Sequence, residues 1–168
     1  NFLYLSVSTN KKYIMKNTIL IILFLSINIC FSQNNKVQGL PELTTTINDF
    51  EDILSDNQEF LLNTSIRYFY ERTQIPITIA TVNSIQPYST FSDFSLALAK
   101  ETKSACILIV VSKSLRNIHI QNCDDVVAQI TDEETKAIID DFMIPKFKNN
   151  DFFNGLLNGL AEIKKEFN

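Results

Sequence analysis

Aspartate side chains occupy positions at which α/β proteins often gather ligands. Asp49 follows a β-prone run, and Asp132 lies at the start of a predicted helix. Ligands bind beyond the carboxyl ends of parallel strands in open α/β sheets, and oxygen ligands from separate segments suit a hard cation such as Ca²⁺ or Mg²⁺. On residue types alone, helix capping and solvation explain these acids more simply, because Asp132 already suits the positive end of a helix dipole.

Two adjacent acidic pairs have the residue types of a general acid and base. They are Asp124-Asp125 and Asp140-Asp141. Neighbouring acids on a solvated turn or helix face are usually inert, so solvation is again the simpler interpretation. Asp141 lies about 60° from Ile138 on a helical wheel. We therefore expect Asp141 to border a buried face.

The histidine content disfavours nucleophilic and zinc chemistry. His119 is the one histidine in the sequence, and it lies between two isoleucines of a predicted strand. A Ser-His-Asp triad needs an imidazole oriented toward a nucleophile, and a solitary histidine cannot build a zinc site. We predict that His119 lies at the edge of the core or faces solvent. The sequence identifies no catalytic residue.

The charge balance argues against nucleic acid as a partner. The formal net charge is −4, from 15 basic and 19 acidic side chains. Removal of residues 1–32 would take away three lysines and no acid, which gives a net charge of −7. Such a surface repels phosphate backbones and favours a cation. Three glycines in the whole sequence also argue against a Gly-rich phosphate loop.

A secretory signal peptide is predicted over residues 15–32. Met15 and Lys16 precede an apolar run that ends at Phe31 and is followed by polar residues, which is the pattern of an exported protein. The run is too short for a comfortable membrane span. We predict cleavage after Ser32, and a lipoprotein acylated at Cys30 is the weaker alternative.

Processing would divide the chain into four parts. Residues 1–14 are predicted to be upstream sequence outside the fold, 15–32 the signal peptide, 33–43 a flexible leader, and 44–168 one domain. The length of the mature chain suits a single core. We expect the mature protein to be periplasmic or secreted, without a membrane span.

Two neighbouring runs predict a β-hairpin at the centre of a sheet. Residues 105–111 are apolar at every position, so both faces need cover, as in a strand between two helical layers. Residues 117–121 alternate between isoleucine and polar residues, which is typical of a strand with one buried face. The polar residues between the runs are expected to form the turn.

Periodicity and capping signals predict the other elements. Ser55 with Gln58 and Thr131 with Glu134 are capping boxes, and Pro145 is expected to end or kink the third helix. The predicted elements are strand 44–47, helix 55–72, strand 77–82, a helix from 90, strands 105–112 and 117–121, helix 131–143, and a helix from 151. This order predicts an α/β fold, a three-layer α/β/α Rossmann-like sandwich with a mixed four-stranded sheet.

Two cysteines remain after removal of the signal peptide. Thiols can pair in an oxidising compartment. Because Cys106 lies in the buried run and Cys123 follows the next strand, two unpaired small residues are the favoured interpretation. A disulfide between them stays an open alternative.

A series of motifs stands in a specific order along the predicted domain. The motifs are Asn48-Asp49 with Leu54-Ser55, Ile77 to Val82, Cys106 to Val111 with Arg116 to Ile120, Ile130-Thr131-Asp132, Ile138 to Asp141, Met143 to Phe147, and Asp151 to Leu156. This series resembles the TPM domain family, also called TPM phosphatases. The resemblance covers about residues 46–167 and is strongest in the C-terminal part.

The resemblance implies a Rossmann-like α/β/α sandwich in an exported or lumenal protein. It also implies a divalent cation, Ca²⁺ or Mg²⁺, in an acidic cleft at one end of the sheet. By motif position, Asp49 and Asp132 correspond to cleft acids, with Asp141 as a further candidate. Family members in chloroplasts resemble acid phosphatases and serve in photosystem repair, and many bacterial members are envelope proteins.

Two departures from the family pattern bear on activity. The family's Asn-Gly before the central strand is Ser104-Ala105 here, and its Gly-x-Gly after the hairpin is replaced by Gln121 to Asp124. Glycines at such places let the backbone approach a ligand closely, so their loss affects activity more than fold. Asp124 and Asp125 in the altered loop are candidates to compensate as cation ligands.

Two functional hypotheses follow. The favoured one is a binding or assembly module of the cell envelope, with a protein partner and with the cation as a structural clamp, because no nucleophile or basic phosphate clamp is visible. The alternative is a metal-dependent acid phosphatase, in which the metal polarises a phosphomonoester or activates water. The sequence does not identify the substrate, the partner, the ion or the oligomeric state.

Overall fold

A computed structural model describes residues 39–102 and 105–167. Its sheet has the strand order β1-β2-β3-β4, with β1 at Ile47–Asp49, β2 at Ile77–Thr81, β3 at Ile107–Ser112 and β4 at Asn117–Asn122. The first three strands run parallel, and β4 returns antiparallel to β3. The predicted mixed sheet and its hairpin are confirmed. The predicted upstream sequence and signal peptide lie outside the described residues.

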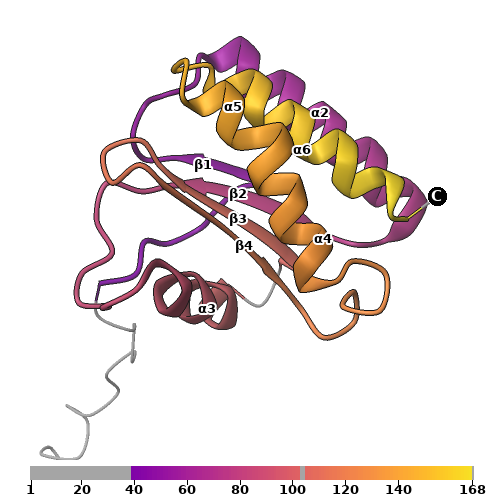
Figure 1. Cartoon of the computed structure of the whole chain (residues 1–168), viewed down its shortest axis with the longest axis horizontal. Helices are drawn as coiled ribbons and strands as arrows, with labels where there is room; N and C mark the ends of the chain where they lie inside the picture. The colour runs from indigo at the N-terminus through magenta and orange to yellow at the C-terminus, as the bar shows by residue number, and fades with distance from the viewer. Residues whose placement is uncertain (1–38, 103–104, 168) are drawn as a thin grey trace, which may run out of the picture. The chain divides into compact units, whose positions relative to one another are not determined.

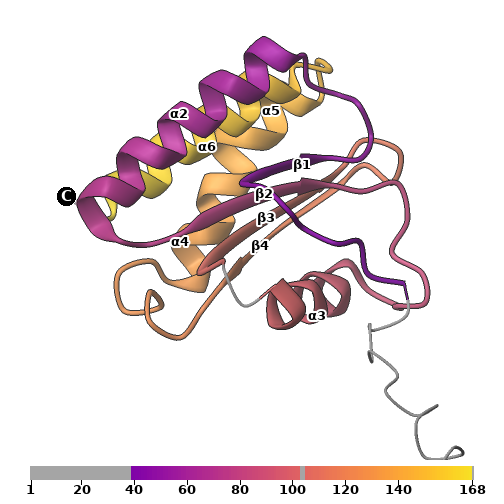
Figure 2. The same cartoon turned by 180° about the vertical axis from the view of Figure 1, so that it is seen from behind.

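Helices cover both faces of the sheet (Figures 1 and 2). Helix α3 (Phe91–Thr102) lies on one face, and α2 (Asp56–Thr73) and α6 (Phe152–Lys165) lie on the other. The second face also carries α4 (Asp132–Ala137), the π-helical segment η2 (Ile138–Met143) and α5 (Ile144–Phe147). The predicted three-layer α/β/α sandwich is therefore confirmed.

The two central strands are buried along their whole length. Ile107 and Ile109 of β3 pack in the cluster that contains residues of α2 and α6, whereas Leu108 and Val110 pack in the cluster that contains residues of α3. Successive side chains of a strand point to opposite faces. Cover on both faces therefore explains why this strand is a continuous apolar run.

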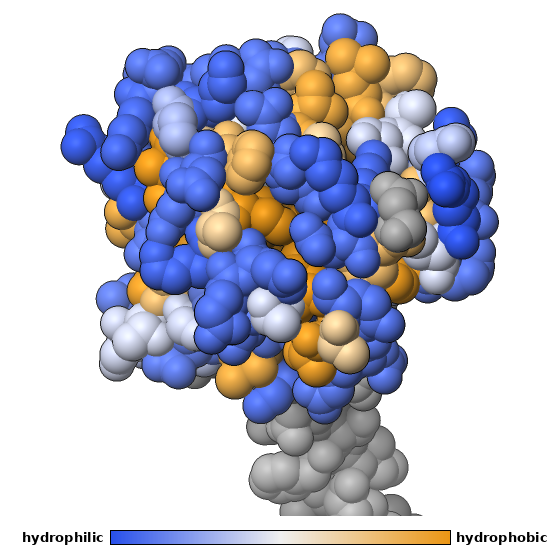
Figure 3. Space-filling view, turned by 45° about the vertical axis from the view of Figure 1, so that its right-hand side comes forward, coloured by the Kyte–Doolittle hydropathy of each residue, from blue (hydrophilic) through white to orange (hydrophobic). Residues whose placement is uncertain are grey.

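Apolar surface is interrupted by polar residues. On the face shown in Figure 3, hydrophobic residues reach the surface in a strip and in patches that hydrophilic residues surround. The most exposed large apolar side chains of the described residues include Phe60 and Tyr68 of α2. Within residues 39–102 and 105–167, no helix is both long enough and apolar enough to cross a membrane.

Strand β1 begins later than the threonine run predicts. The strand was expected over residues 44–47, whereas it spans Ile47–Asp49. The Asn48 side chain explains the shift, because its Oδ1 accepts from the Thr44 N–H at 3.0 Å and its Nδ2 donates to the Thr45 carbonyl at 2.7 Å. Such local side-chain bonds compete with strand pairing and turn the chain.

Both predicted capping boxes start helices. The Ser55 N–H donates to Gln58 Oε1 at 2.9 Å at the start of α2. At α4, the Thr131 N–H donates to Glu134 Oε2 at 2.8 Å, and the Glu134 N–H donates to Thr131 Oγ1 at 3.2 Å. Hydrogen bonds that the Thr131 N–H and the Thr131 hydroxyl donate to the Glu134 carboxylate lower the pKa of that group. Each box satisfies backbone donors that a helix start leaves open.

The third predicted helix changes its pitch before Pro145. The Ile144 N–H donates to the Ile139 carbonyl, five residues back, and this wider turn leads into α5, which contains Pro145. Proline cannot donate to the preceding turn, and π-helical turns are a common local adjustment. The changed pitch also alters the helical wheel. Asp141 is exposed, so the expectation that it borders the buried face is wrong.

Two glycines of α6 let η2 and α5 approach closely. A Cβ atom on Gly155 would lie 2.2 Å from Cε1 of Phe147, and one on Gly159 would lie 2.6 Å from Sδ of Met143. Real Cβ atoms do not make such contacts. The absence of a side chain at these two positions therefore allows the close approach of η2 and α5.

Cys106 and Cys123 form a disulfide. Their Cα atoms lie 4.9 Å apart, and the Cys123 N–H donates to the Cys106 carbonyl at 2.7 Å. The favoured expectation of two unpaired thiols is therefore wrong. The antiparallel hairpin is the physical reason, because it brings the residue after β4 opposite the residue before β3.

Candidate functional site

Asp49 lies at the carboxyl edge of the sheet, where β1 ends. Its Oδ1 accepts from Thr81 Oγ1 at 2.5 Å, and its Oδ2 accepts from the Leu54 N–H at 2.7 Å. Both carboxylate oxygens thus accept hydrogen bonds, one from β2 and the other from the connection between β1 and α2. This arrangement gives Asp49 a structural role in joining β1 to α2.

Asp132 lies at the other end of the sheet. β4 ends at Asn122, which is opposite Ile107, the first residue of β3. The Asn122 Nδ2 then donates to Thr135 Oγ1 at 2.9 Å, which holds the start of α4 at this end. Because β4 is antiparallel, the chain returns to the amino end of β3 before α4 begins. Asp49 and Asp132 therefore do not share the predicted cleft.

The other predicted ligands do not join either acid. Asp124 and Asp125 are exposed in the turn that follows β4, and Asp141 is exposed on η2. Among the described residues, no group of three or more His, Cys, Asp or Glu side chains is placed to hold a metal ion. The predicted set therefore does not fit one coordination site. Cation binding by any single member stays a prediction.

Acids do gather near Asp49, but their charges oppose one another. Burial raises the pKa of Glu59, and the nearby charges of Asp49, Asp56 and Asp52 raise it further. These residues belong to the end of β1 and the start of α2. The cluster indicates repulsion between carboxylates at this corner of the molecule.

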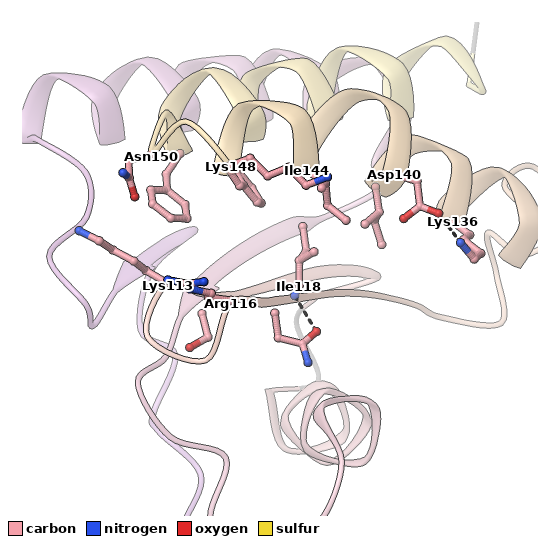
Figure 4. Close-up of a pocket in the computed structure, with 13 residues that line it drawn as sticks. Lys113, Arg116, Ile118, Lys136, Asp140, Ile144, Lys148 and Asn150 are labelled. Atoms are coloured by element: carbon pink, nitrogen blue, oxygen red, sulfur yellow. Dashed lines mark hydrogen bonds and ion pairs between the residues drawn. The ribbon is translucent and has the colours of Figure 1, made fainter.

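A pocket of about 700 Å³ lies between the β3–β4 hairpin and the helices that follow β4 (Figure 4). This volume is within the range of small-ligand sites. We call it the basic pocket. Its lining residues come from β3, the hairpin turn, β4, α4, η2, α5 and the start of α6: Ser112, Lys113, Arg116, Asn117, Ile118, Lys136, Ile139, Asp140, Ile144, Phe147, Lys148, Asn150 and Phe152.

Cationic side chains outnumber acids in this lining. Lys113 and Arg116 come from the hairpin turn, Lys136 from α4, and Lys148 from the residue after α5. Lys136 forms an ion pair with Asp140, and this contact raises the pKa of Lys136. In the described part of the chain, no carboxylate forms an ion pair with Lys113, Arg116 or Lys148. The pocket is therefore positively charged in a chain whose net charge is negative.

Sequence reasoning missed this concentration of positive charge. The four cations are spread from position 113 to position 148 and follow no motif. Lys148 follows the π-helical turn and the short α5 and lines the same pocket as the hairpin residues. The one available signal was the interruption of the helix pattern by Pro145, which does not predict the direction that the chain takes after it.

Glu51 fixes the turn that carries Lys113 and Arg116. The Lys113 N–H donates to Glu51 Oε2 at 2.7 Å, and the Ser114 N–H donates to Glu51 Oε1 at 3.1 Å. The Glu51 N–H donates in turn to Thr81 Oγ1 at 3.0 Å. A carboxylate that follows β1 thus occupies the backbone donors of the hairpin turn.

His119 is half-buried on β4, opposite Val110 of β3. Burial lowers the pKa of its imidazole, while a hydrogen bond with Gln121 and the charge of Asp132 act in the opposite direction. The prediction of a histidine at the edge of the core is confirmed. His119 is absent from the lining of the basic pocket.

Comparisons with known proteins identify the family and the fold. The sequence model of the TPM domain matches residues 47–166. No curated protein matches the chain.

Solved structures with a similar fold include three bacterial proteins. An N-terminal domain of a protein from P. gingivalis has a TM-score of 0.67 at 22% identity, over 73% of this chain and 81% of that chain. The BA42 protein from Bizionia argentinensis has 0.60 at 16%, over 70% and 83%. The N-terminal domain of the cg2496 protein from Corynebacterium glutamicum has 0.59 at 12%, over 74% and 82%. At these identities the likeness supports the fold alone.

Proposed function

This chain belongs to the TPM domain family, and on that premise we propose that it is an exported binding module that captures a negatively charged partner in the basic pocket. One observation carries the proposal. Lys113, Arg116 and Lys148 line one pocket, and no carboxylate of the described residues forms an ion pair with them. Cations that have no carboxylate partner in a concave site attract anions, because a cleft lined by one sign of charge focuses the field.

The charge of the rest of the chain makes this contrast useful for selectivity. The net charge of the sequence is −4, so an anionic partner is repelled by most of the surface and attracted at this pocket. Charge complementarity of this kind mainly sets orientation and association rate. A binding module that selects one orientation of its partner would use such an arrangement.

The disulfide supports the proposed location. Cys106 and Cys123 are bonded, and disulfides persist in periplasmic and extracellular proteins but are rare in the cytosol. This supports the predicted export to the periplasm or outside the cell. The proposed partner is accordingly a component of the cell envelope.

The alternative function is a metal-dependent acid phosphatase. That hypothesis needs a metal held by carboxylates near the substrate, and the five predicted carboxylates do not form one coordination site. The basic pocket would instead supply binding without a metal. The binding proposal therefore requires neither Ca²⁺ nor Mg²⁺.

A titration with citrate tests the binding proposal, because citrate is a small anion with several carboxylates. We expect saturable shifts of the backbone amides of Lys113, Arg116 and Lys148 in nitrogen-15 NMR spectra of the disulfide-bonded protein. Lys148→Gln should weaken binding by about threefold, the effect of one exposed charge pair. Lys100→Gln on α3, an exposed lysine on the other face of the sheet, is the matched control and should not change the affinity.

A turnover assay separates the two functions. With p-nitrophenyl phosphate and either divalent cation, we expect no phosphate release above the rate of the Asp49→Asn variant. A cation-dependent rate that Asp49→Asn abolishes would support the phosphatase instead. Failure of citrate to shift any residue of the basic pocket would contradict the binding proposal.

A further inference from the structure

We propose that the basic pocket receives an acidic peptide segment of its partner, in which carboxylate side chains flank apolar ones. This inference rests on the proposed binding function and names the chemistry of the partner. It follows from how the charges are spread, from the apolar residues between them, and from the state of the backbone donors at the hairpin.

The cations of the pocket are distributed along it instead of meeting at one point. Figure 4 shows Lys113 and Arg116 on the hairpin side and Lys136 with Asp140 at the opposite end. Lys148 lies on the helical side between them (Figure 4). A single phosphate or carboxylate is best held by donors that converge on it. Several separated carboxylates on one chain match a distributed set better.

Apolar side chains lie between these charges. Ile118 of β4 and Ile139, Ile144 and Phe147 of the opposite helices line the pocket. All four are partly buried and leave some apolar surface accessible. The Phe147 ring also stacks on Phe152, with centroids 5.1 Å apart. A ligand that covers such a surface gains affinity from its own apolar groups.

The backbone donors of the hairpin favour carboxylates over phosphate as the recognised group. Phosphate sites commonly use consecutive backbone N–H groups of a turn. Here the N–H groups of Lys113 and Ser114 already donate to the two oxygens of Glu51. The groups that remain for an anion at this turn are side chains, without the backbone N–H groups that phosphate sites commonly use.

Strand pairing is not the expected mode of recognition. Two backbone groups of β4 are held by neighbouring side chains, since the Ile118 N–H donates to Asn117 Oδ1 at 2.8 Å and the Asn122 carbonyl accepts from Gln121 Nε2 at 3.0 Å. Protected edges of this kind resist the addition of another strand. The peptide is therefore recognised through its side chains.

Three labelled synthetic peptides test the inference by fluorescence anisotropy. The first alternates acidic and aliphatic residues, the second replaces each acid by its amide, and the third replaces each aliphatic residue by serine. We expect the first to bind best and the amide peptide to bind at least about tenfold more weakly, because several charge pairs are lost. The affinity of the serine peptide should be about threefold to fourfold lower for each buried methylene group that it lacks.

Variants of the protein place the peptide in the pocket. Arg116→Gln and Lys148→Gln should each weaken the binding of the first peptide by about twofold to fivefold, and Lys100→Gln should not change it. Ile144→Ser should reduce the preference for the aliphatic peptide over the serine peptide. Unchanged melting temperatures of these variants would show that they fold, and binding should also weaken as salt screens the charges.

The outcomes separate this inference from the binding function. Equal binding of the acidic and amide peptides, or equal loss in Lys100→Gln and Lys148→Gln, would overturn the peptide proposal. Binding of octyl phosphate or of anionic lipid vesicles at the pocket, without binding of the acidic peptide, would also overturn it and would leave the capture of anions standing. If neither citrate nor any of these probes binds at the pocket, both the binding proposal and the peptide proposal are wrong.

Discussion

The Glu51 carboxylate accepts a hydrogen bond from the Lys113 N–H at 2.7 Å across 62 positions of the sequence. This contact ties the connection after β1 to the turn between β3 and β4. Its second oxygen accepts from the Ser114 N–H at 3.1 Å. The position of the basic side chains on this turn therefore depends on a residue outside the basic pocket.

Removal of the Glu51 carboxylate should loosen the hairpin turn. Glu51→Ala loses two charge-assisted hydrogen bonds at a partly exposed site, so we expect the free energy of unfolding to fall by about 1 kcal/mol. Urea denaturation measures this loss. Glu101→Ala, which removes an exposed carboxylate on α3, is the control. An equal loss of stability in that variant would contradict the proposed role of Glu51.

Loss of the disulfide should destabilise the domain. The Cys106–Cys123 bond closes a loop of 17 positions, and a loop of this size contributes about 3 kcal/mol by restricting the unfolded chain. Urea denaturation of the Cys106→Ser, Cys123→Ser double variant, compared with the oxidised protein, measures this contribution. Equal stability of the two proteins would show that the bond does not contribute to folding in solution.

Gly155→Ala should disturb the wall of the basic pocket. The new methyl group would meet the Phe147 ring at 2.2 Å, so the ring must move, and overpacking of this kind costs about 1–3 kcal/mol. We expect a lower melting temperature and a weaker response to citrate. Asn158→Ala in the same helix meets no such contact and is the control. A Gly155→Ala protein with unchanged stability would contradict the close packing of α5 on α6.

His119 should make stability depend on pH. Burial lowers the pKa of its imidazole below the ordinary value of 6.5, so the unfolded chain takes up a proton more readily than the folded one. The contribution of His119 to the free energy of unfolding should therefore be fully present above about pH 7.5 and decline as the pH falls through 6.5. His119→Gln should remove this part of the decline in melting temperature. Identical pH profiles for the two proteins would refute the assignment.

The cation prediction can be tested by the response of two separated acids. Titration with Ca²⁺ or Mg²⁺ should not shift the amides of Asp49 and Asp132 with one common affinity, because the sheet places these residues at opposite ends. Backbone amide shifts measure the response of each residue. A saturable shift of both at the same cation concentration would restore the predicted shared site.

Local signals in the sequence were sufficient for most of the fold. A fully apolar run can be satisfied only between two layers, so β3 was predictable as a central strand, and the alternation in β4 showed its single buried face. The capping boxes at Ser55 and Thr131 also predicted the starts of two helices correctly, because a capping box depends on residues within one helical turn. Strand β1 begins later than predicted, since the side chain of Asn48 competes with strand pairing.

The candidate site required the tertiary structure. The direction of β4 separates Asp132 from Asp49, and the same hairpin brings Cys106 to Cys123. Asp141 is exposed in the π-helical turn before Pro145, and Lys148, which follows that turn, lines the pocket beside the hairpin. The sequence by itself determined which segments are buried and where helices begin, because those properties depend on neighbouring residues. The tertiary structure decided which charges meet, because that depends on strand direction and helix pitch over dozens of positions.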